Sequence, residues 1–376
     1  MTKKIRITYV IDTLNTDLAG TESQLIRLIN GLDKVRFEVH LLCFRDHPWF
    51  QAYRDSLDCD TTIIDIREFK KLSVYRNILK LVGHFRRTRP DIVHTFFPVA
   101  NIVAVIAARL AGVCHVVSSR RDYGEWMSGR YLSFTKLSNR FARKIVANSH
   151  SVKALTVEAE GVAAEKIDVI YNGIDVTKFG GLSVDWALKQ RLNIPKTNKV
   201  VGIVANFRPM KRHDTFLHAA HELLKHRSDV DFLLVGGGGS AEPDTVALGK
   251  ALGIAERLHF TGPQPDVVPY LSIMDVGVNC SEQEGLSNAV MEYMASGVPC
   301  IVSQSGGNPD LIAHSQNGLT FPLGDYRALA EGIDILLDNA ELRERFRLAA
   351  KKRVLTDMTV MTMLANYERW YAGMVN

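Results

Sequence analysis

Short apolar runs alternate with longer segments of mixed character along the whole 376-residue chain. The runs at 5–11, 37–43 and 92–96 are rich in isoleucine, valine and aromatic residues and contain few polar positions. The segments between them, such as 21–31 and 100–111, place apolar residues at helical spacing. Continuous apolar strands separated by helices are typical of parallel sheets that are covered on both faces. The pattern therefore predicts an α/β protein.

The alternation runs through both halves of the chain. Strands are predicted at 5–11, 37–43, 62–66, 92–96, 115–119, 144–147 and 168–171, and again at 200–205, 230–235, 258–261, 276–279, 300–303 and 318–321. Helices are predicted at 21–31, 73–87, 100–111, 151–160, 215–224, 244–252, 266–274, 288–296, 326–337 and 361–374. A chain of this length favours two domains, and each half repeats the nucleotide-binding scheme. We expect two Rossmann-like domains, at 1–174 and 175–355.

The boundary between the halves is predicted at the Asn-Gly-Ile-Asp turn of residues 172–175. Asn-Gly commonly supplies positive φ and ends a strand, so we expect that conformation here. The last segment, 356–376, carries an aromatic-rich helix that either caps the second domain or returns to the first.

Composition places the chain among ordinary globular proteins, with 46% apolar residues and no extreme charge. Its five cysteines lack C-x-x-C spacing, so neither a zinc site nor a disulfide framework is predicted. The apolar run after the basic N-terminus is too short for a signal peptide, and the most apolar stretch, 101–113, is too short to span a bilayer. We expect a cytoplasmic protein.

Positive charge is concentrated in the first half, which has a net charge of +7 for residues 1–175 against −2 for 176–376. The densest basic run, 70–89, alternates lysine and arginine with leucine, valine and isoleucine, as an amphipathic helix does. Such a helix is either solvated and packed on a sheet or a membrane-surface element. Peripheral contact with the inner face of a membrane is therefore an expectation of the sequence, and nucleic acid is not an expected partner.

Two glutamates, Glu284 and Glu292, are separated by seven residues where a predicted loop leads into a helix. A helix start presents unpaired N–H groups and partial positive charge, which suit a phosphate. An ionised carboxylate is a pure acceptor and suits sugar hydroxyls. For an isolated pair, an amphipathic helix with solvated glutamates is the ordinary interpretation. With its flanking residues, the arrangement fits a sugar attached to a nucleoside diphosphate.

The flanking residues carry a family resemblance. The shared positions are Ser281, Glu284, Gly285, Glu292, Ala295, Gly297 and Pro299. They resemble the E-x7-E signature of retaining, family-4-type glycosyltransferases of the GT-B fold, except that Ser287 stands where the family often has proline. The resemblance implies two Rossmann-like domains facing across a cleft, a last helix crossing back to the first domain, and 172–175 as the interdomain segment. It also implies that Glu292 holds ribose hydroxyls, that Glu284 holds sugar hydroxyls, and that Gly285, Leu286 and Ser287 open the phosphate-binding helix.

Basic residues follow the strand predicted at 200–205. Arg208 and Lys211 lie just past it, where they could neutralise a departing pyrophosphate. The family pairs an arginine with a lysine at this place, and Lys211 matches the lysine. Asn206 holds the common arginine position, so the role is assigned to Arg208, with the register open.

Glycines follow several of the predicted strands. Gly236, in a run of four glycines, and Gly262 resemble family positions beside the nucleotide, because glycine permits close approach of a ligand to the backbone. Gly20 resembles the glycine-rich loop near the donor phosphate. The loop 305–310 resembles the Gly-Gly-x-x-Glu loop, with Asp310 in place of glutamate, and is predicted to support the donor loop.

In the first domain, His94 matches the first histidine of the family's Asp-Val-Val-His-x-His segment. The second histidine position, which in the family often reaches the donor sugar, is Phe96. His94 is therefore either a donor contact or a satisfied core histidine, and we assign it to the catalytic set. Arg120 and Asp122 follow another predicted strand and are expected to contact an acceptor.

These assignments predict a retaining glycosyltransferase that needs no metal or other cofactor and moves a sugar from a nucleotide sugar to a carbohydrate or lipid-linked acceptor. Polysaccharide or glycolipid assembly would be its setting. A sugar-nucleotide epimerase of the same fold, or a non-catalytic nucleotide-sugar-binding protein, remains an alternative. The sequence leaves open the sugar, the base, the acceptor and the oligomeric state.

Overall fold

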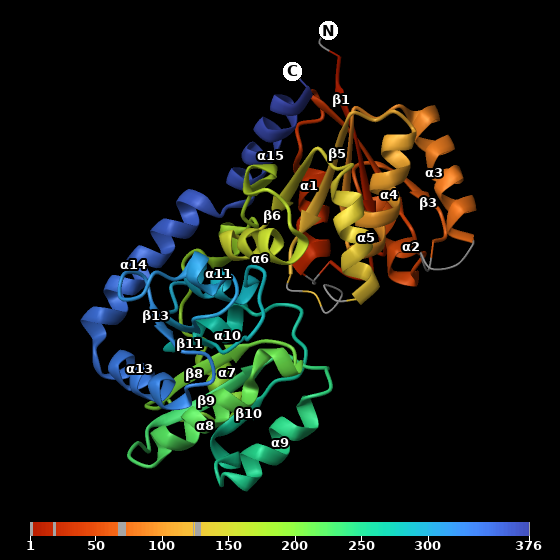
Figure 1. Cartoon of the computed structure of the whole chain (residues 1–376). Helices are drawn as coiled ribbons and strands as arrows, with labels where there is room; N and C mark the ends of the chain where they lie inside the picture. Colours follow the sequence, from red (N-terminus) through yellow and green to blue (C-terminus); the bar gives the residue numbers. More distant parts are fainter. Residues whose placement is uncertain (1–2, 18–19, 67–72, 123, 125–128, 376) are drawn as a thin grey trace. The chain divides into compact units, whose positions relative to one another are not determined.

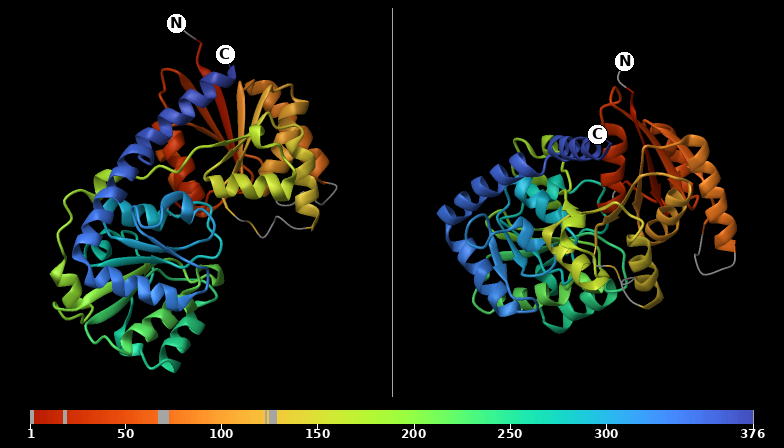
Figure 2. Two further views of the ribbon diagram at one scale, coloured as in Figure 1. Left: turned by 60° about the vertical axis from the view of Figure 1, so that its left-hand side comes forward. Right: turned by 45° about the horizontal axis from the view of Figure 1, so that its top comes forward.

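The computed structural model describes residues 3–17, 20–66, 73–122, 124 and 129–375. The chain divides into two compact units, shown in Figure 1. The N-terminal unit comprises Met1–Gly173 together with Val360–Asn376, and the C-terminal unit comprises Ile174–Thr359. Each unit is built on one parallel sheet with helices on both faces (Figure 2). The α/β fold class is therefore confirmed, as two Rossmann-like units.

The N-terminal sheet has the strand order β3-β2-β1-β4-β5-β6-β7, and every pair is parallel. Its strands are β1 (Ile5–Ile11), β2 (Phe37–Cys43), β3 (Asp60–Ile63), β4 (Ile92–Phe96), β5 (His115–Arg120), β6 (Lys144–Ala147) and β7 (Ile167–Val169). Its helices are α1 (Gly20–Gly31), α2 (Pro48–Tyr53), α3 (Ser73–Thr88), α4 (Pro98–Leu110), α5 (Gly129–Asn139), α6 (His150–Glu160) and α15 (Val360–Val375). Alternate residues of the central strands feed two cores, one under α1 and α15 and one under α3 and α4.

The last helix, α15, packs on the N-terminal sheet through a buried polar chain. The Tyr371 hydroxyl lies 2.7 Å from Nδ1 of His94 and 3.1 Å from the Tyr9 hydroxyl. Nε2 of His94 lies 2.7 Å from Oγ of Ser119. All four residues are buried. Residues far apart in the sequence thus hold the helix against β1, β4 and β5.

Removal of the Tyr371 hydroxyl is expected to loosen this helix. Tyr371→Phe should lower the free energy of unfolding by about 1–3 kcal/mol, because His94 and Tyr9 each lose a buried hydrogen-bond partner. Urea unfolding followed by circular dichroism measures the change. Tyr75→Phe is a matched control, since Tyr75 is 67% exposed, and its unfolding should be unchanged. Equal stabilities of the two variants would contradict this anchoring role.

The C-terminal sheet has the order β10-β9-β8-β11-β12-β13 and is also fully parallel. Its strands are β8 (Lys199–Val204), β9 (Val230–Val235), β10 (Leu258–Phe260), β11 (Val276–Asn279), β12 (Cys300–Ser303) and β13 (Leu319–Phe321). Its helices are α7 (Trp186–Arg191), α8 (His213–Leu224), α9 (Glu242–Ala251), α10 (Val268–Ser272), α11 (Asn288–Ser296), α12 (Asn308–Leu311), α13 (Tyr326–Asp338) and α14 (Ala340–Asp357). The strand order reverses between β8 and β11, which makes their carboxyl ends the topological switch point of this sheet.

Tyr293 of α11 joins the two strands at the switch point. Its hydroxyl accepts a hydrogen bond from the Val204 amide at 2.8 Å and lies 3.3 Å from the Val278 carbonyl oxygen. Its ring packs on Gly277, where a Cβ atom would lie within 2.8 Å of it. A helix of the candidate site is thereby fixed to both strands that carry the site.

The apolar pattern does not predict every helix of the described residues. The unpredicted helices are α2, α5, α7, α12 and α14. The 18-residue α14 buries only Phe346, Ala350 and Val354, a narrow stripe with charged residues on all sides. So narrow a stripe gives little helical periodicity, because an ordinary surface helix shows three to four apolar positions per two turns.

The turn at 172–175 differs from its prediction. Neither Asn172 nor Gly173 has positive φ. Instead the Gln24 side chain accepts from the Gly173 amide at 2.9 Å and donates to the Gly173 carbonyl at 3.0 Å. A side chain of α1 therefore fixes the turn, and left-handed backbone is not required.

None of the helices described here is both long and apolar enough to cross a membrane.

Candidate functional site

Two sequence-predicted residues meet at the C-terminal switch point. Lys211 ends a 3₁₀ turn (Pro209–Lys211) that follows β8, and Glu284 lies in the loop after β11. Nζ of Lys211 donates to Oε2 of Glu284 at 2.6 Å, and the side chains are 17% and 13% exposed. The Glu282 amide donates to the Met210 carbonyl at 2.8 Å, so the two loops are also joined through their backbones. An ammonium and a carboxylate are thus held together where ligands of such sheets bind.

The loop that carries Glu284 rests on two glycines. The Gly307 amide donates to the Glu284 carbonyl at 2.8 Å. A Cβ atom on Gly306 would overlap the Glu284 backbone, and one on Gly307 would overlap the carbonyl of Gly285. The Ser305 hydroxyl also donates to the Glu282 carbonyl. The segment 305–310 therefore packs directly beneath the predicted donor loop.

A methyl group on Gly307 is expected to displace this loop. Gly307→Ala should destabilise the C-terminal unit by about 1–3 kcal/mol, since the new Cβ has no room against the Gly285 carbonyl. Thermal unfolding measures the loss. Gly180→Ala provides the control, because the nearest atom to its Cβ would be 3.7 Å away, an ordinary contact. If Gly307→Ala unfolds at the same temperature as the control, the close approach of Gly307 to the Gly285 carbonyl does not constrain the loop.

A buried polar network holds the start of α11. Nδ2 of Asn279 donates to Oγ of Ser287 at 3.1 Å, and Oδ1 of Asn279 accepts from the Ser281 amide at 3.0 Å and from Nδ2 of Asn308 at 3.1 Å. Ser287 is fully buried and caps α11 by accepting from the Val290 amide. A proline here could not form that side-chain cap, so the serine found at this family position has a structural use. The signal for the network is the polar Asn279 that ends an otherwise apolar strand.

The helix itself begins at Asn288, one residue after Ser287. Gly285 and Leu286, predicted as the helix opening, therefore lie in the preceding loop, and both are buried. Glu292 lies in the second turn of α11 and is partly buried. The order of loop carboxylate, helix start and helix carboxylate is the one that the sequence predicts.

The glycines after β9 allow other segments of the protein backbone to approach closely. A Cβ atom on Gly236 would overlap the Ala205 carbonyl, and one on Gly239 would overlap the Phe207 carbonyl. Gly236 also donates from its amide to the Gly262 carbonyl at 3.2 Å. The missing side chain of Gly236 therefore makes room for the segment after β8, and its place beside a nucleotide stays a prediction. Gly262 itself has a φ of 70°, and a Cβ atom added to it would meet no atom within 4 Å.

The sequence does not determine which arginine acts together with Lys211. Arg208 is exposed, and among the described residues its side chain has no hydrogen-bond or ion-pair partner. Arg212, which the sequence does not single out, binds Asp214 through Nε at 3.0 Å and Nη2 at 2.9 Å, and its Nη1 lies 3.8 Å from Glu282. The pKa of Arg212 is raised, chiefly by the hydrogen bond to Asp214. Of these two arginines, Arg208 is the one whose guanidinium has no hydrogen-bond or ion-pair partner among the described residues.

In the N-terminal unit, Gly20 begins α1 after β1, and Asp122 follows β5; both are exposed. His94 has a different place. Its ring is fully buried, both nitrogens are within 2.7 Å of hydroxyl groups, and burial lowers its pKa well below the usual value. The assignment of His94 to the catalytic set is corrected: it is the satisfied core histidine of the two alternatives. Phe96 is equally buried and stacks on it.

The prediction that Arg120 contacts an acceptor is also corrected. Its guanidinium binds both carboxylate oxygens of Glu160, at 2.7 Å and 2.8 Å, and Oδ1 of Asn139 at 2.9 Å. The Arg120 and Glu160 side chains are 1% and 0% exposed. A group so completely enclosed is not accessible to an acceptor sugar, and no local pattern in the sequence indicates its partner on α6.

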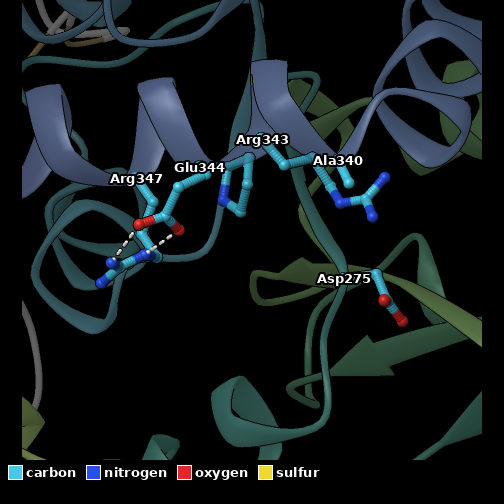
Figure 3. A pocket seen from close by; sticks show the side chains of 7 residues that line it. Asp275, Ala340, Arg343, Glu344 and Arg347 are labelled. Carbon is cyan, nitrogen blue, oxygen red and sulfur yellow. Dashed lines mark hydrogen bonds and ion pairs between the residues drawn. The ribbon is translucent and has the colours of Figure 1, made fainter.

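A cavity of ≈ 320 Å³ lies at the amino-terminal end of the C-terminal sheet (Figure 3). It is lined by Asp275, Gly297, Pro299, Ala340, Arg343, Glu344 and Arg347. Its arginines have local partners: Arg347 binds Glu344, and Arg343 donates to the Leu337 carbonyl at 2.7 Å. The cavity is at the end of the sheet opposite to Lys211 and Glu284, so it is not part of the candidate site. No cluster of three potential metal ligands occurs among the residues that the structure describes.

Comparison with known proteins agrees with this geometry. Residues 184–353 match the family model described as "Glycosyl transferases group 1", and residues 18–178 match "Glycosyltransferase Family 4". The chain is 31% identical over 300 residues to N-acetyl-alpha-D-glucosaminyl L-malate synthase of Bacillus anthracis, covering 78% of this chain and 77% of that protein. The chain belongs to the family-4-like glycosyltransferases of the GT-B fold.

Other relatives extend over more of this glycosyltransferase. It is 25% identical over 348 residues to an Escherichia coli UDP-Gal:alpha-D-GlcNAc-diphosphoundecaprenol alpha-1,3-galactosyltransferase, covering 90% of this chain and 89% of that one. Among solved structures, HepE of Anabaena in complex with UDP has a TM-score of 0.84 at 21% identity, with 98% of this chain and 100% of that chain covered. A Rickettsia africae glycosyltransferase has a TM-score of 0.87 at 18% identity, with 99% of each chain covered. These structures establish the GT-B fold of the glycosyltransferase.

Proposed function

We propose that this glycosyltransferase takes a sugar from a nucleoside diphosphate sugar held mainly by its C-terminal unit and transfers it, with retention of anomeric configuration, to a hydroxyl of a carbohydrate or lipid-linked acceptor. The observation that carries the proposal is the 2.6 Å contact between Lys211 and Glu284 at the switch point. Relatives named for UDP-galactose and GDP-mannose use donors of this class. One relative is named for a diphosphoundecaprenol-linked acceptor.

Lys211 is proposed to neutralise the leaving group. An ammonium has three donors, and one of them is used by Glu284, so two remain for diphosphate oxygens. Negative charge accumulates on the diphosphate as the glycosidic bond breaks, and a fixed cation stabilises that charge more than it stabilises the bound donor. Arg208, exposed and uncommitted just before the same turn, is placed to add a second cation.

The glutamates are proposed to orient the donor. Glu284 would accept hydrogen bonds from sugar hydroxyls while it positions Lys211, and Glu292, in the second turn of α11, would accept hydrogen bonds from ribose hydroxyls. The start of α11, capped by Ser287, would face the phosphates with its positive end. Catalysis then depends chiefly on position and on charge, for which no divalent metal is required.

The transfer step exchanges two bonds at the anomeric carbon. The bond to the diphosphate oxygen breaks, the bond to the acceptor oxygen forms on the same face, and the acceptor proton passes to a diphosphate oxygen. No side chain needs to act as a nucleophile in this scheme, which is consistent with the burial of His94. A lipid-linked acceptor would place the enzyme in polysaccharide or glycolipid assembly.

A panel of nucleotide sugars tests the proposal. Thermal unfolding should shift upward with one UDP- or GDP-sugar and less with the sugar alone, because a ligand that binds the folded state stabilises it. With that donor and an acceptor, NMR of the product should show the anomeric configuration of the donor, and added chelator should leave the rate unchanged. Inversion, or loss of activity with chelator, would refute the mechanism. A new epimer formed from donor alone would indicate the epimerase alternative.

A further inference from the structure

Three adjoining helices of the N-terminal unit share a lack of acidic residues. α3, α4 and α5 have 16, 13 and 11 residues, and none of these is aspartate or glutamate. α4 packs between α3 and α5, and all three lie on the same side of the sheet (Figure 1). We call their outer surface the α3–α5 face. The basic residues on its helices are Arg76, Lys80, Arg86, Arg87, Arg109, Arg130 and Lys136. Lys70 and Lys71, also part of the basic run, lie outside the described residues.

Large apolar side chains are exposed on the same face. Tyr75 and Leu79 of α3 are 67% and 69% exposed, and Leu110 of α4 is 59% exposed. Phe134 and Leu137 of α5 are 41% and 43% exposed. Tyr75 and Leu79 are four residues apart, so they share one stripe of α3, and Phe134 and Leu137 share a stripe of α5. Single exposed apolar residues are ordinary, but several gathered on adjoining helices indicate contact with a partner.

The basic residues of this face have no carboxylate partner in the part of the chain that the structure describes. Among the described residues, no carboxylate forms an ion pair with Arg76, Lys80 or Arg87 of α3, or with Arg130 or Lys136 of α5. Within the same described ranges, the one hydrogen bond of the Arg86 side chain goes to a carbonyl, that of Leu110, at 3.3 Å. As far as the described residues go, the face therefore presents unpaired basic side chains beside exposed apolar groups.

We propose that the α3–α5 face docks on a bilayer that contains anionic phospholipid. Its charge is complementary to the lipid headgroups, and exposed leucine, tyrosine and phenylalanine side chains can enter the boundary between headgroups and acyl chains. A polyanion such as nucleic acid would use the charge but not Leu79, Leu110 and Leu137. The inference goes beyond the proposed transfer reaction and does not depend on it.

Vesicle co-sedimentation of the full-length protein tests the docking. Vesicles of phosphatidylcholine mixed with phosphatidylglycerol should bind the protein, vesicles of phosphatidylcholine alone should bind it weakly, and raised salt should weaken the binding to the mixed vesicles. Arg76→Glu with Lys80→Glu should reduce partitioning about 30-fold or more, since each basic residue near the membrane contributes about a fivefold factor. Leu79→Ser with Phe134→Ser should reduce it about tenfold through lost insertion.

The control reverses the same number of charges elsewhere. Lys196→Glu with Lys250→Glu alters two exposed lysines of the C-terminal unit and gives the same change in net charge. It should bind mixed vesicles as the unchanged protein does. The proposal is overturned if the control loses as much binding as the α3 variant, or if neutral vesicles bind equally well. It is also overturned if the apolar variant binds without loss, because the face would then be a general polyanion site. Transfer to a water-soluble acceptor should be the same in all variants, which separates this result from a failure of the proposed function.

Discussion

Lys211→Ala should reduce turnover about 10²- to 10³-fold, the loss expected when one group that stabilises developing charge is removed from an active site. The structure gives the reason. Nζ of Lys211 is fixed by Glu284 at 2.6 Å and is only partly exposed, so its charge acts in a site that excludes much of the water. The effect should appear mainly in kcat, because the diphosphate becomes more negative in the transition state than in the bound donor. Steady-state kinetics with saturating donor measures it.

Two further variants make the test specific. Lys225→Ala is the matched control: Lys225 also binds a glutamate, Glu222, but at the exposed end of α8, and its loss should leave the rate unchanged. Lys211→Ala combined with Glu284→Ala should cost much less than the product of the two separate losses, because the residues act as one unit. Near-normal turnover of Lys211→Ala, in protein that unfolds at the usual temperature, would contradict the assignment.

The sequence predicted the residues of this pair because each follows a buried strand of the same sheet. An apolar run marks where β8 and β11 end, and in a doubly wound sheet both ends meet at the switch point. The positions of Lys211 and Glu284 therefore followed from local signals. The direct contact between them did not, since it depends on how Gly306 and Gly307 support the loop after β11.

The roles predicted for other residues were wrong for a different reason. His94 carries a family motif, but its partner Tyr371 lies 277 positions along the chain, on a helix whose docking site no local pattern reveals. Arg120 follows a strand, as an acceptor contact would, yet its guanidinium is enclosed by Glu160 and Asn139. A motif identifies the residue type that a position needs, whereas the neighbouring atoms come from the tertiary fold and determine what the residue does.

The second large effect is expected on stability, when the buried ion pair between Arg120 and Glu160 is broken. Glu160→Ala should lower the free energy of unfolding of the N-terminal unit by about 3–5 kcal/mol, because it leaves a buried guanidinium without its counter-charge. For a unit of this size, each kcal/mol corresponds to a shift of about 2–4 °C in Tm, so calorimetry should detect the change clearly. Lys144→Ala, which breaks a half-exposed ion pair with Asp168, is the control and should cost less than about 1 kcal/mol.

Removal of both charges separates a structural role from an acceptor-binding one. Arg120→Met combined with Glu160→Leu replaces the ion pair by apolar groups of similar size, and such replacements are often neutral or stabilising. The double variant should therefore recover most of the stability lost in Glu160→Ala. It should also transfer sugar with an unchanged KM for acceptor, since the Arg120 guanidinium is enclosed by Glu160 and Asn139. A raised acceptor KM in a stably folded double variant would show that Arg120 reaches the acceptor after all.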